Sequence, residues 1–336
     1  MRKTIGGLAM AAALFSIAGG LLARAPEIDD DLMASRRVFP DIGPGLRAVR
    51  HGANGNYYVL ASPSVGVAVF DAKGKQVSVI GGGPAPPVTN KAGRSATAFG
   101  EDCDVDEQGN VYVADRGYNL ISEFGPDGKQ VRAFPVDGLL SLAVLPEGEV
   151  AVTTAQSEHQ VTVYGLNGKI SREFGDIESL STRADIDRYL NLGRVASDPQ
   201  GHIYYGFTYM PEPLVRQFDR YGNAKLDFVF TGVDAYPEAS ATRKAIAKQE
   251  VGTEALVFRA ILTAFGVDPV NGDVWMGLHN TLVHFDKDGI RRSEYQIYTP
   301  KGVALDATVI LVEEQRLLIG ADPLGVYEFH RPDRKR

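Results

Sequence analysis

The chain has 336 residues, of which 44% are hydrophobic and 23% are charged, and its formal net charge is −7. This composition is typical of a globular protein and argues against a largely disordered chain. The negative charge disfavours binding of nucleic acid through a basic face, and the single cysteine, Cys103, excludes an intrachain disulfide and a cysteine-rich zinc site.

The first 25 residues have the pattern of an export signal. A basic start, Arg2 and Lys3, precedes the uncharged stretch 5–23, and an acidic run follows at 27–31. Small residues at positions 23 and 25 suit cleavage, whereas a helix over 5–23 is about 28 Å long and can span a bilayer. We therefore expect a hydrophobic leader helix that is either a signal peptide or a single-span membrane anchor. The protein is then exported, and is either periplasmic or extracytoplasmic, or secreted.

One kind of hairpin recurs six times after residue 45. Each copy is an aromatic residue at the end of an apolar run, followed by a short turn that closes on glycine, as in residues 70–74 (FDAKG). Glycine tolerates the positive φ that such turns need. Further copies lie at 124–128, 164–168, 218–222 and 285–289, and a last copy at Phe329 lacks the glycine.

A second hairpin precedes each of these copies. Its turn contains Gly55, Gly109, Gly148, Gly201 or Gly272, and the sixth copy lies at 314–319. The runs on both sides are rich in β-branched and aromatic residues, as strands are. Two hairpins repeated six times predict an all-β fold, a six-bladed β-propeller of four-stranded antiparallel blades over 45–331. A β-sandwich has no such repeat, and the chain lacks the helix–strand alternation of a doubly wound fold.

The copy at residues 104–124 (DVDEQGNVYVADRGYNLISEF) resembles the NHL repeat. This resemblance implies a TolB-like six-bladed propeller.

Both ends of the chain bear on how the ring closes. Residues 303–329 supply only three strands, so we expect the fourth from 36–39, within the linker 26–44. An N-terminal strand there removes the free edge of the last blade. The propeller is expected to end at Arg331, and 332–336 form a basic tail. We expect the segment from Arg331 to the last residue to be frayed and solvated.

Two insertions interrupt the repeat. Residues 177–189 predict a short helix that begins near Ser181 or Thr182, and 232–259 contains a run of helix formers at 238–250. Both connect one blade to the next, on the face where the loops between second and third strands also lie. Long insertions of this kind commonly shape a binding surface.

Polar and aromatic residues are expected to gather on this same face, which we call the upper face. Such a mixture suits recognition of a protein, peptide or glycan, so the sequence predicts a binding module with no catalytic residue. Arg47 and Arg194 are expected to reach towards the central channel. The predicted surface residues are Glu101, Asp102, Asp115, Arg116, Tyr118, His159, Tyr209, Met210, Arg259, His279, Asn280 and Asp322.

An alternative is a metal-assisted propeller hydrolase or lactonase. Calcium takes oxygen ligands, and Glu101, Asp102, Asn191 and Asp306 are the candidates for an axial ion. The histidines occupy different points of the repeat and are not expected to converge on zinc. The sequence holds no hydrolase elbow and no phosphate-binding motif. Apart from calcium under this alternative, no cofactor is expected, and the only membrane contact expected is through residues 5–23.

Overall fold

The computed structural model describes residues 30–62, 66–81, 99–231, 237–252 and 256–334, and the backbone of 88–89 and 95–96. The predicted leader at 1–25 lies outside the described residues. Within them, neither helix has the length and apolar character needed to cross a bilayer.

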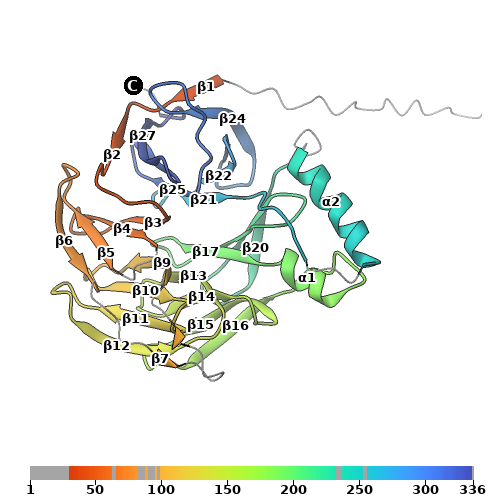
Figure 1. The fold of residues 1–336 in the computed structure, drawn as a ribbon, viewed down its shortest axis with the longest axis horizontal. Coiled ribbons are helices and arrows are strands. Elements are labelled where there is room, and N and C mark those ends of the chain that lie inside the picture. The colour runs from red at the N-terminus through yellow and green to blue at the C-terminus, as the bar shows by residue number, and fades with distance from the viewer. Residues whose placement is uncertain are drawn as a thin grey trace, which may run out of the picture.

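The first three blades follow the N-terminal strands, each with its strands in chain order from the centre outwards (Figure 1). Blade 1 contains β3 (Leu46–His51), β4 (Tyr57–Ala61), β5 (Val67–Phe70) and β6 (Gln76–Ile80). A small hairpin, β7 (Val88–Thr89) and β8 (Ser95–Ala96), follows it. Blade 2 contains β9 (Gly100–Val105), β10 (Val111–Asp115), β11 (Leu120–Phe124) and β12 (Gln130–Pro135). Blade 3 contains β13 (Leu139–Val144), β14 (Val150–Thr154), β15 (His159–Tyr164) and β16 (Ile170–Asp176).

The other three blades complete the ring. Blade 4 contains β17 (Gly193–Ser197), β18 (Ile203–Phe207), β19 (Leu214–Phe218) and β20 (Ala224–Val229). Blade 5 contains β21 (Ala264–Val267), β22 (Val274–Leu278), β23 (Thr281–Phe285) and β24 (Arg291–Tyr298). Blade 6 contains β25 (Val309–Val312), β26 (Arg316–Ala321) and β27 (Gly325–His330). The innermost strands contact one another in sequence, and β25 contacts β3. The predicted six-bladed propeller of four-stranded antiparallel blades is therefore confirmed.

The predicted glycine turns explain why the strands pair as they do. Gly74 has a φ of +80°, and its N–H donates to the carbonyl of Asp71 at 2.8 Å. The Asp71 carboxylate also accepts the backbone N–H groups of Lys73 and Lys75, each at 2.9 Å. The side chain thus fixes the turn that glycine permits. Positive φ recurs at the equivalent positions Gly128, Gly168, Gly222 and Gly289.

Each junction between neighbouring blades has its own buried apolar cluster. Between blades 3 and 4, for example, the rings of Phe174 and Phe218 meet edge to face at 4.9 Å. Between blades 5 and 6, Trp275 is fully buried. Burying a large apolar side chain stabilises a fold by about 1.5–3 kcal/mol. No blade can bury both of its faces alone, so the stability of each depends on its neighbours.

The N-terminal segment joins the ring through two strands. β2 (Arg36–Val38) pairs antiparallel with β27 and gives blade 6 its fourth strand. Just before it, β1 (Asp30–Met33) pairs parallel with β24 and adds a fifth strand to blade 5. β1 was not predicted from the sequence. A single short segment therefore links the outer edges of the last two blades.

Polar contacts between blades 1 and 6 reinforce this closure on the lower face, where the inner strands end. The Glu313 carboxylate accepts a hydrogen bond from Tyr57 at 2.7 Å and pairs with His51 at 2.8 Å and Arg316 at 2.5 Å. Burial opposes ionisation of Glu313, but these partners outweigh it and lower its pKa to about 2.

This shift makes part of the stability pH-dependent. A carboxyl group whose pKa is lower in the folded chain stabilises the fold above its unfolded pKa, here 4.5, and the contribution is lost as the pH falls towards 2. Glu313→Gln should therefore lower the free energy of unfolding at pH 7 by about 1–2 kcal/mol, allowing for solvent screening. Denaturant titrations should show this difference shrinking between pH 5 and pH 3. A difference that is constant with pH would contradict the assignment.

The start of the C-terminal tail differs from the expectation of a solvated segment. The Arg331 guanidinium lies 2.5 Å from the Asp268 carboxylate, and both side chains have no exposed surface. Arg331 also pairs with Asp333 at 2.6 Å and lies over the Trp275 ring. A buried carboxylate such as Asp268 needs a cation beside it, and this need holds Arg331 in the structure.

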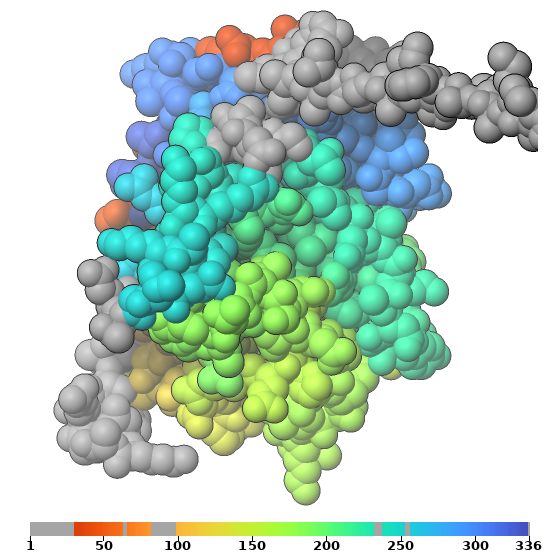
Figure 2. Space-filling view, turned by 90° about the vertical axis from the view of Figure 1, so that its right-hand side faces the viewer, coloured from red at the N-terminus to blue at the C-terminus, as the bar shows by residue number. Residues whose placement is uncertain are grey.

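Both insertions form helices, and the helices pack together. α1 (Ala184–Leu190) and α2 (Pro237–Glu250) lie side by side in Figures 1 and 2. α1 begins after Arg183, whose extended backbone ends the preceding loop. Arg183 donates to the Gly252 carbonyl at 2.8 Å, and Ser181 donates to Glu250 at 3.0 Å. These bonds tie the two insertions to each other.

Candidate functional site

The upper face, where the inner strands begin, has a cavity of about 390 Å³ at its centre. We call it the mouth cavity. Every blade contributes to its lining, and Leu192 and Ala260 come from the segments that directly follow the two insertions. The full lining is Leu46, Arg47, Glu101, Leu140, Leu192, Gly193, Arg194, Thr208, Tyr209, Ala260, Thr263, Thr308 and Asp322.

A second cavity of about 150 Å³ lies further along the same inner strands. We call it the axial cavity. The two cavities share Arg47, Arg194 and Thr308, so these side chains separate them. Arg194 Nη1 lies 3.5 Å from the backbone carbonyl of Arg47. Because blades 4 and 1 stand opposite each other in a six-membered ring, Arg194 reaches across the axis and forms the floor of the mouth cavity.

Two arginines, Arg47 and Arg194, and two carboxylates, Glu101 and Asp322, line the mouth cavity. The Glu101 carboxylate lies 3.7 Å from Arg47 and 3.7 Å from Arg116, which is longer than a direct hydrogen bond. Arg47 Nε is buried without a hydrogen-bond partner among the described residues. Arg194 likewise has no ion pair with any residue that the structure describes. The Asp322 carboxylate is engaged by the Gly45 N–H at 2.7 Å.

The axial cavity contains a closed charge network. Arg50 pairs with Asp102 at 2.9 Å and with Asp104 at 3.4 Å. Burial opposes the charge of Arg50, but the two carboxylates prevail and raise its pKa. Asp102 also accepts the Ser141 hydroxyl at 2.6 Å. The Arg50 guanidinium thus occupies the position beside Asp102 and Asp104 that a bound cation would take.

The four residues proposed for an axial calcium ion do not fit one. Asp102 is already neutralised by Arg50. The Asn191 side chain accepts the Glu178 N–H and donates to the carbonyls of Glu178 and Asp187, so it caps α1. Asp306 is exposed and lines neither cavity. Of the four, only Glu101 lines the mouth cavity, where it lies between Arg47 and Arg116. The other carboxylate of this lining, Asp322, accepts the Gly45 N–H, so the oxygens of the cavity do not form the set of six or more that calcium takes.

The structure brings some of the predicted surface residues together. Glu101, Tyr209 and Asp322 line the mouth cavity with Arg47 and Arg194. The Tyr209 ring packs at 4.9 Å from Tyr189 of α1, and burial raises the pKa of its hydroxyl. The wall formed by Tyr209 is therefore held by the helical insertions.

Other predicted residues hold loops in place. The Asp115 carboxylate accepts the backbone N–H groups of Phe99 at 3.0 Å and Gly117 at 2.8 Å. The His279 ring nitrogen Nε2 lies 3.0 Å from the Ala260 carbonyl. Asn280 donates to Gln296 at 2.6 Å.

The remaining predicted residues lie outside the mouth lining. Met210 is in the core between blades 3 and 4. Tyr118 and His159 are half-buried at the loops of blades 2 and 3, and Arg259 is exposed beside Ala260.

Sequence reasoning missed several lining residues. Leu140 and the threonines at 208, 263 and 308 carry no charge or motif that marks them. Arg50 was also missed, although it follows Arg47 by three residues on the same inner strand. Leu140 and Arg50 lie on first strands, and Thr263 and Thr308 directly precede first strands, so this position was the available signal for them. Thr208 follows the second strand of blade 4 and had no such signal.

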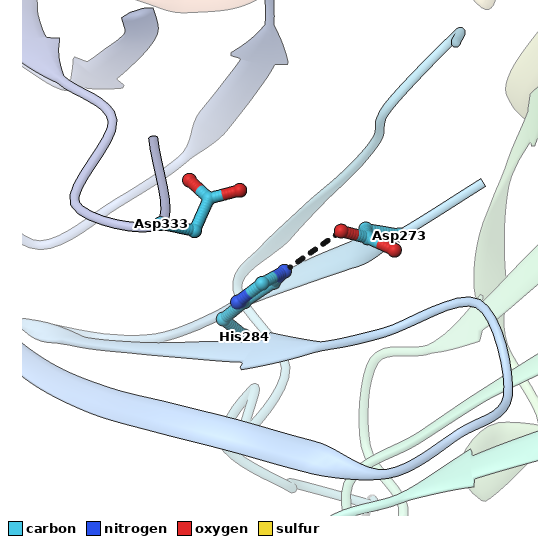
Figure 3. A group of neighbouring side chains, drawn as sticks. All are labelled: Asp273, His284 and Asp333. Atoms are coloured by element: carbon cyan, nitrogen blue, oxygen red, sulfur yellow. Dashed lines mark hydrogen bonds and ion pairs between the residues drawn. The ribbon is translucent and has the colours of Figure 1, made fainter. Parts of the chain in front are cut away.

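A separate cluster on the lower face combines Asp273, His284 and Asp333, whose ligand atoms lie within 4.8 Å of one another (Figure 3). Every carboxylate in it already has partners. Asp273 pairs with His284 at 3.1 Å and accepts the Lys287 N–H at 3.0 Å, and the two Asp333 oxygens accept Nε and Nη2 of Arg331. We interpret it as a charge network that anchors the C-terminal segment.

No family model and no curated protein matches the chain. Among solved structures, a streptogramin B lyase is 12% identical with a TM-score of 0.53, and the match covers 89% of this chain and 87% of that one. A catalytically inactive virginiamycin B lyase from Staphylococcus aureus with quinupristin is 10% identical, with a TM-score of 0.54 and coverage of 87% and 82%. U3-55K is 10% identical, with a TM-score of 0.54 and coverage of 88% and 98%. At these identities the likeness shows the fold alone, a β-propeller.

Proposed function

We propose that the protein is an extracytoplasmic, NHL-like propeller that binds a protein, peptide or glycan in the mouth cavity. One observation carries this proposal: a single cavity is lined by residues from all six blades and bordered by both insertions. A rigid ring with a concave, partly polar centre is a common form of ligand site. The repeat copy at 104–124 supports the NHL-like assignment.

The chemistry of the lining favours binding over catalysis. The hydroxyls of Thr263 and Thr308 donate to the backbone carbonyls of Gly277 and Gly320. Glu101, the nearest base, is held between Arg47 and Arg116. Among the described residues of the lining, no nucleophile is paired with a base, as acyl transfer requires.

The proposal is tested by filling the cavity. Leu140 is half-buried in the lining, so Leu140→Trp should occupy the cavity without disturbing the core. We expect compounds from a panel of short peptides and oligosaccharides that bind the unmodified protein to lose at least about tenfold in affinity, measured by calorimetry. Leu166→Trp, at an exposed turn, is the control and should leave binding unchanged. Binding that survives Leu140→Trp places the ligand elsewhere and refutes the proposal.

Export is the second part of the proposal and rests on the pattern of residues 1–25. Cell fractionation should find the full-length gene product outside the cytoplasm. N-terminal sequencing distinguishes the two forms, since a mature chain beginning after residue 25 is a secreted or periplasmic protein and an intact one is anchored. A cytoplasmic, uncleaved product contradicts export.

A further inference from the structure

We infer that the group recognised on the floor of the mouth cavity is the C-terminal carboxylate of a peptide, bound between Arg194 and Arg47. This inference rests on the proposed binding function and names the ligand class of the same site.

The two guanidiniums are placed to accept an anion. Arg194 crosses the axis, and its one hydrogen bond to the residues that the structure describes, to the Arg47 carbonyl, is long at 3.5 Å. Its side chain lines both cavities. The Arg47 side chain is 33% exposed, and its guanidinium lies over the Phe99 ring at 5.3 Å. Its Nε is buried, so its terminal nitrogens are the donors that a ligand would meet. A carboxylate fits the planar fork of a guanidinium and forms two parallel hydrogen bonds with it.

Existing acidic groups do not satisfy these donors. Glu101 stays 3.7 Å from Arg47. The charged network of Arg50, Asp102 and Asp104 is complete and belongs to the axial cavity. An incoming carboxylate above the floor thus meets Arg47 and Arg194. Of the two carboxylates in the lining, Glu101 is shared between Arg47 and Arg116, and Asp322 accepts the Gly45 N–H. The donors that remain on the two arginines favour an anion at this position, even though the whole chain carries a charge of −7.

The walls favour a peptide over an acidic sugar. Leu46, Leu140 and Leu192 supply apolar surface suited to an aliphatic C-terminal side chain. The aromatic wall residue, Tyr209, packs against Tyr189. The hydroxyls of Thr263 and Thr308 already donate to backbone carbonyls, so their protons are not free for a ligand.

The experiment uses the probe Ala-Ala-Ala-Leu with a free carboxyl terminus, its carboxamide form, and an oligogalacturonate tetramer. Calorimetry should show the free acid binding at least about tenfold more tightly than the amide, since a hydrogen bond to a charged group is stronger than one to a neutral group. Arg194→Gln should remove this preference. Arg194→Lys, which keeps the charge but not the fork, should restore part of it, and Arg292→Gln on the exposed outer strand should leave it intact.

Each outcome decides a different statement. A preference for the free acid that disappears in Arg194→Gln supports the inference. Equal binding of acid and amide, lost in Leu140→Trp, overturns the inference but keeps the proposed function. Binding of the galacturonate alone replaces the peptide with an acidic glycan and overturns the inference. Failure of the unmodified protein to bind any of the three probes overturns the inference, while the wider peptide and oligosaccharide panel then decides the proposed function separately.

Discussion

Arg331→Ala should lower the free energy of unfolding by about 3–5 kcal/mol, the loss expected when a buried ion pair is broken from one side. Among the residues that the structure describes, the substitution leaves the buried Asp268 carboxylate with only Arg334, 3.2 Å away, as a cation. It also removes the guanidinium that lies over Trp275. Equilibrium denaturation in urea measures the effect.

Arg334→Ala is the matched control. Its side chain is 37% exposed and lies further from Asp268, so we expect a loss below about 1 kcal/mol. Replacing Arg331 and Asp268 together by Met and Leu should recover much of the stability, because apolar residues of similar volume replace buried ion pairs well. If Arg331→Ala lowered the free energy of unfolding by less than about 1 kcal/mol, the pair of Arg331 and Asp268 would not hold the C-terminal segment in place.

Deletion of residues 34–40 should destabilise the whole ring. The deletion removes β2 and exposes the edge of β27. It also removes Phe39, which is buried and lies 4.8 Å from the Phe70 ring and 5.2 Å from the Tyr57 ring. Loss of a core phenylalanine alone costs about 3–5 kcal/mol, so we expect a large drop in the thermal midpoint.

Deletion of residues 30–33 tests whether the stability of the ring depends on closure by β2 or on any added outer strand. It removes β1, which is mostly exposed and adds a fifth strand to a blade that already has four. The expected loss is much smaller than for 34–40. Equal thermal midpoints for the two deletions, or no change in either, would contradict closure through β2.

The sequence predicted the features that depend on local structure. Glycine turns such as Gly74, with its Asp71 carboxylate, form within five residues, so their repetition marks the hairpins directly. The number of blades follows from counting them. The fourth strand of blade 6 was predictable because three strands alone leave an edge unpaired.

The features that were missed depend on contacts between distant segments. β1 (Asp30–Met33) carries two acidic residues and no strand pattern, and its pairing with β24 arises only when the blades are assembled. Arg331 looked like part of a solvated tail because its partner, Asp268, lies 63 residues away. At the upper face, the sequence indicated Glu101, Arg47 and Arg194, but it gave no sign that Arg194 crosses the axis to Arg47.

A crystal structure of the protein with Ala-Ala-Ala-Leu bound tests the central claim most directly. We predict the peptide in the mouth cavity, with its terminal carboxylate within hydrogen-bond distance of Arg47 and Arg194 and its leucine against Leu140. A peptide on the lower face or the outer strands, or one that enters the mouth cavity with its carboxylate away from both arginines, would contradict this account.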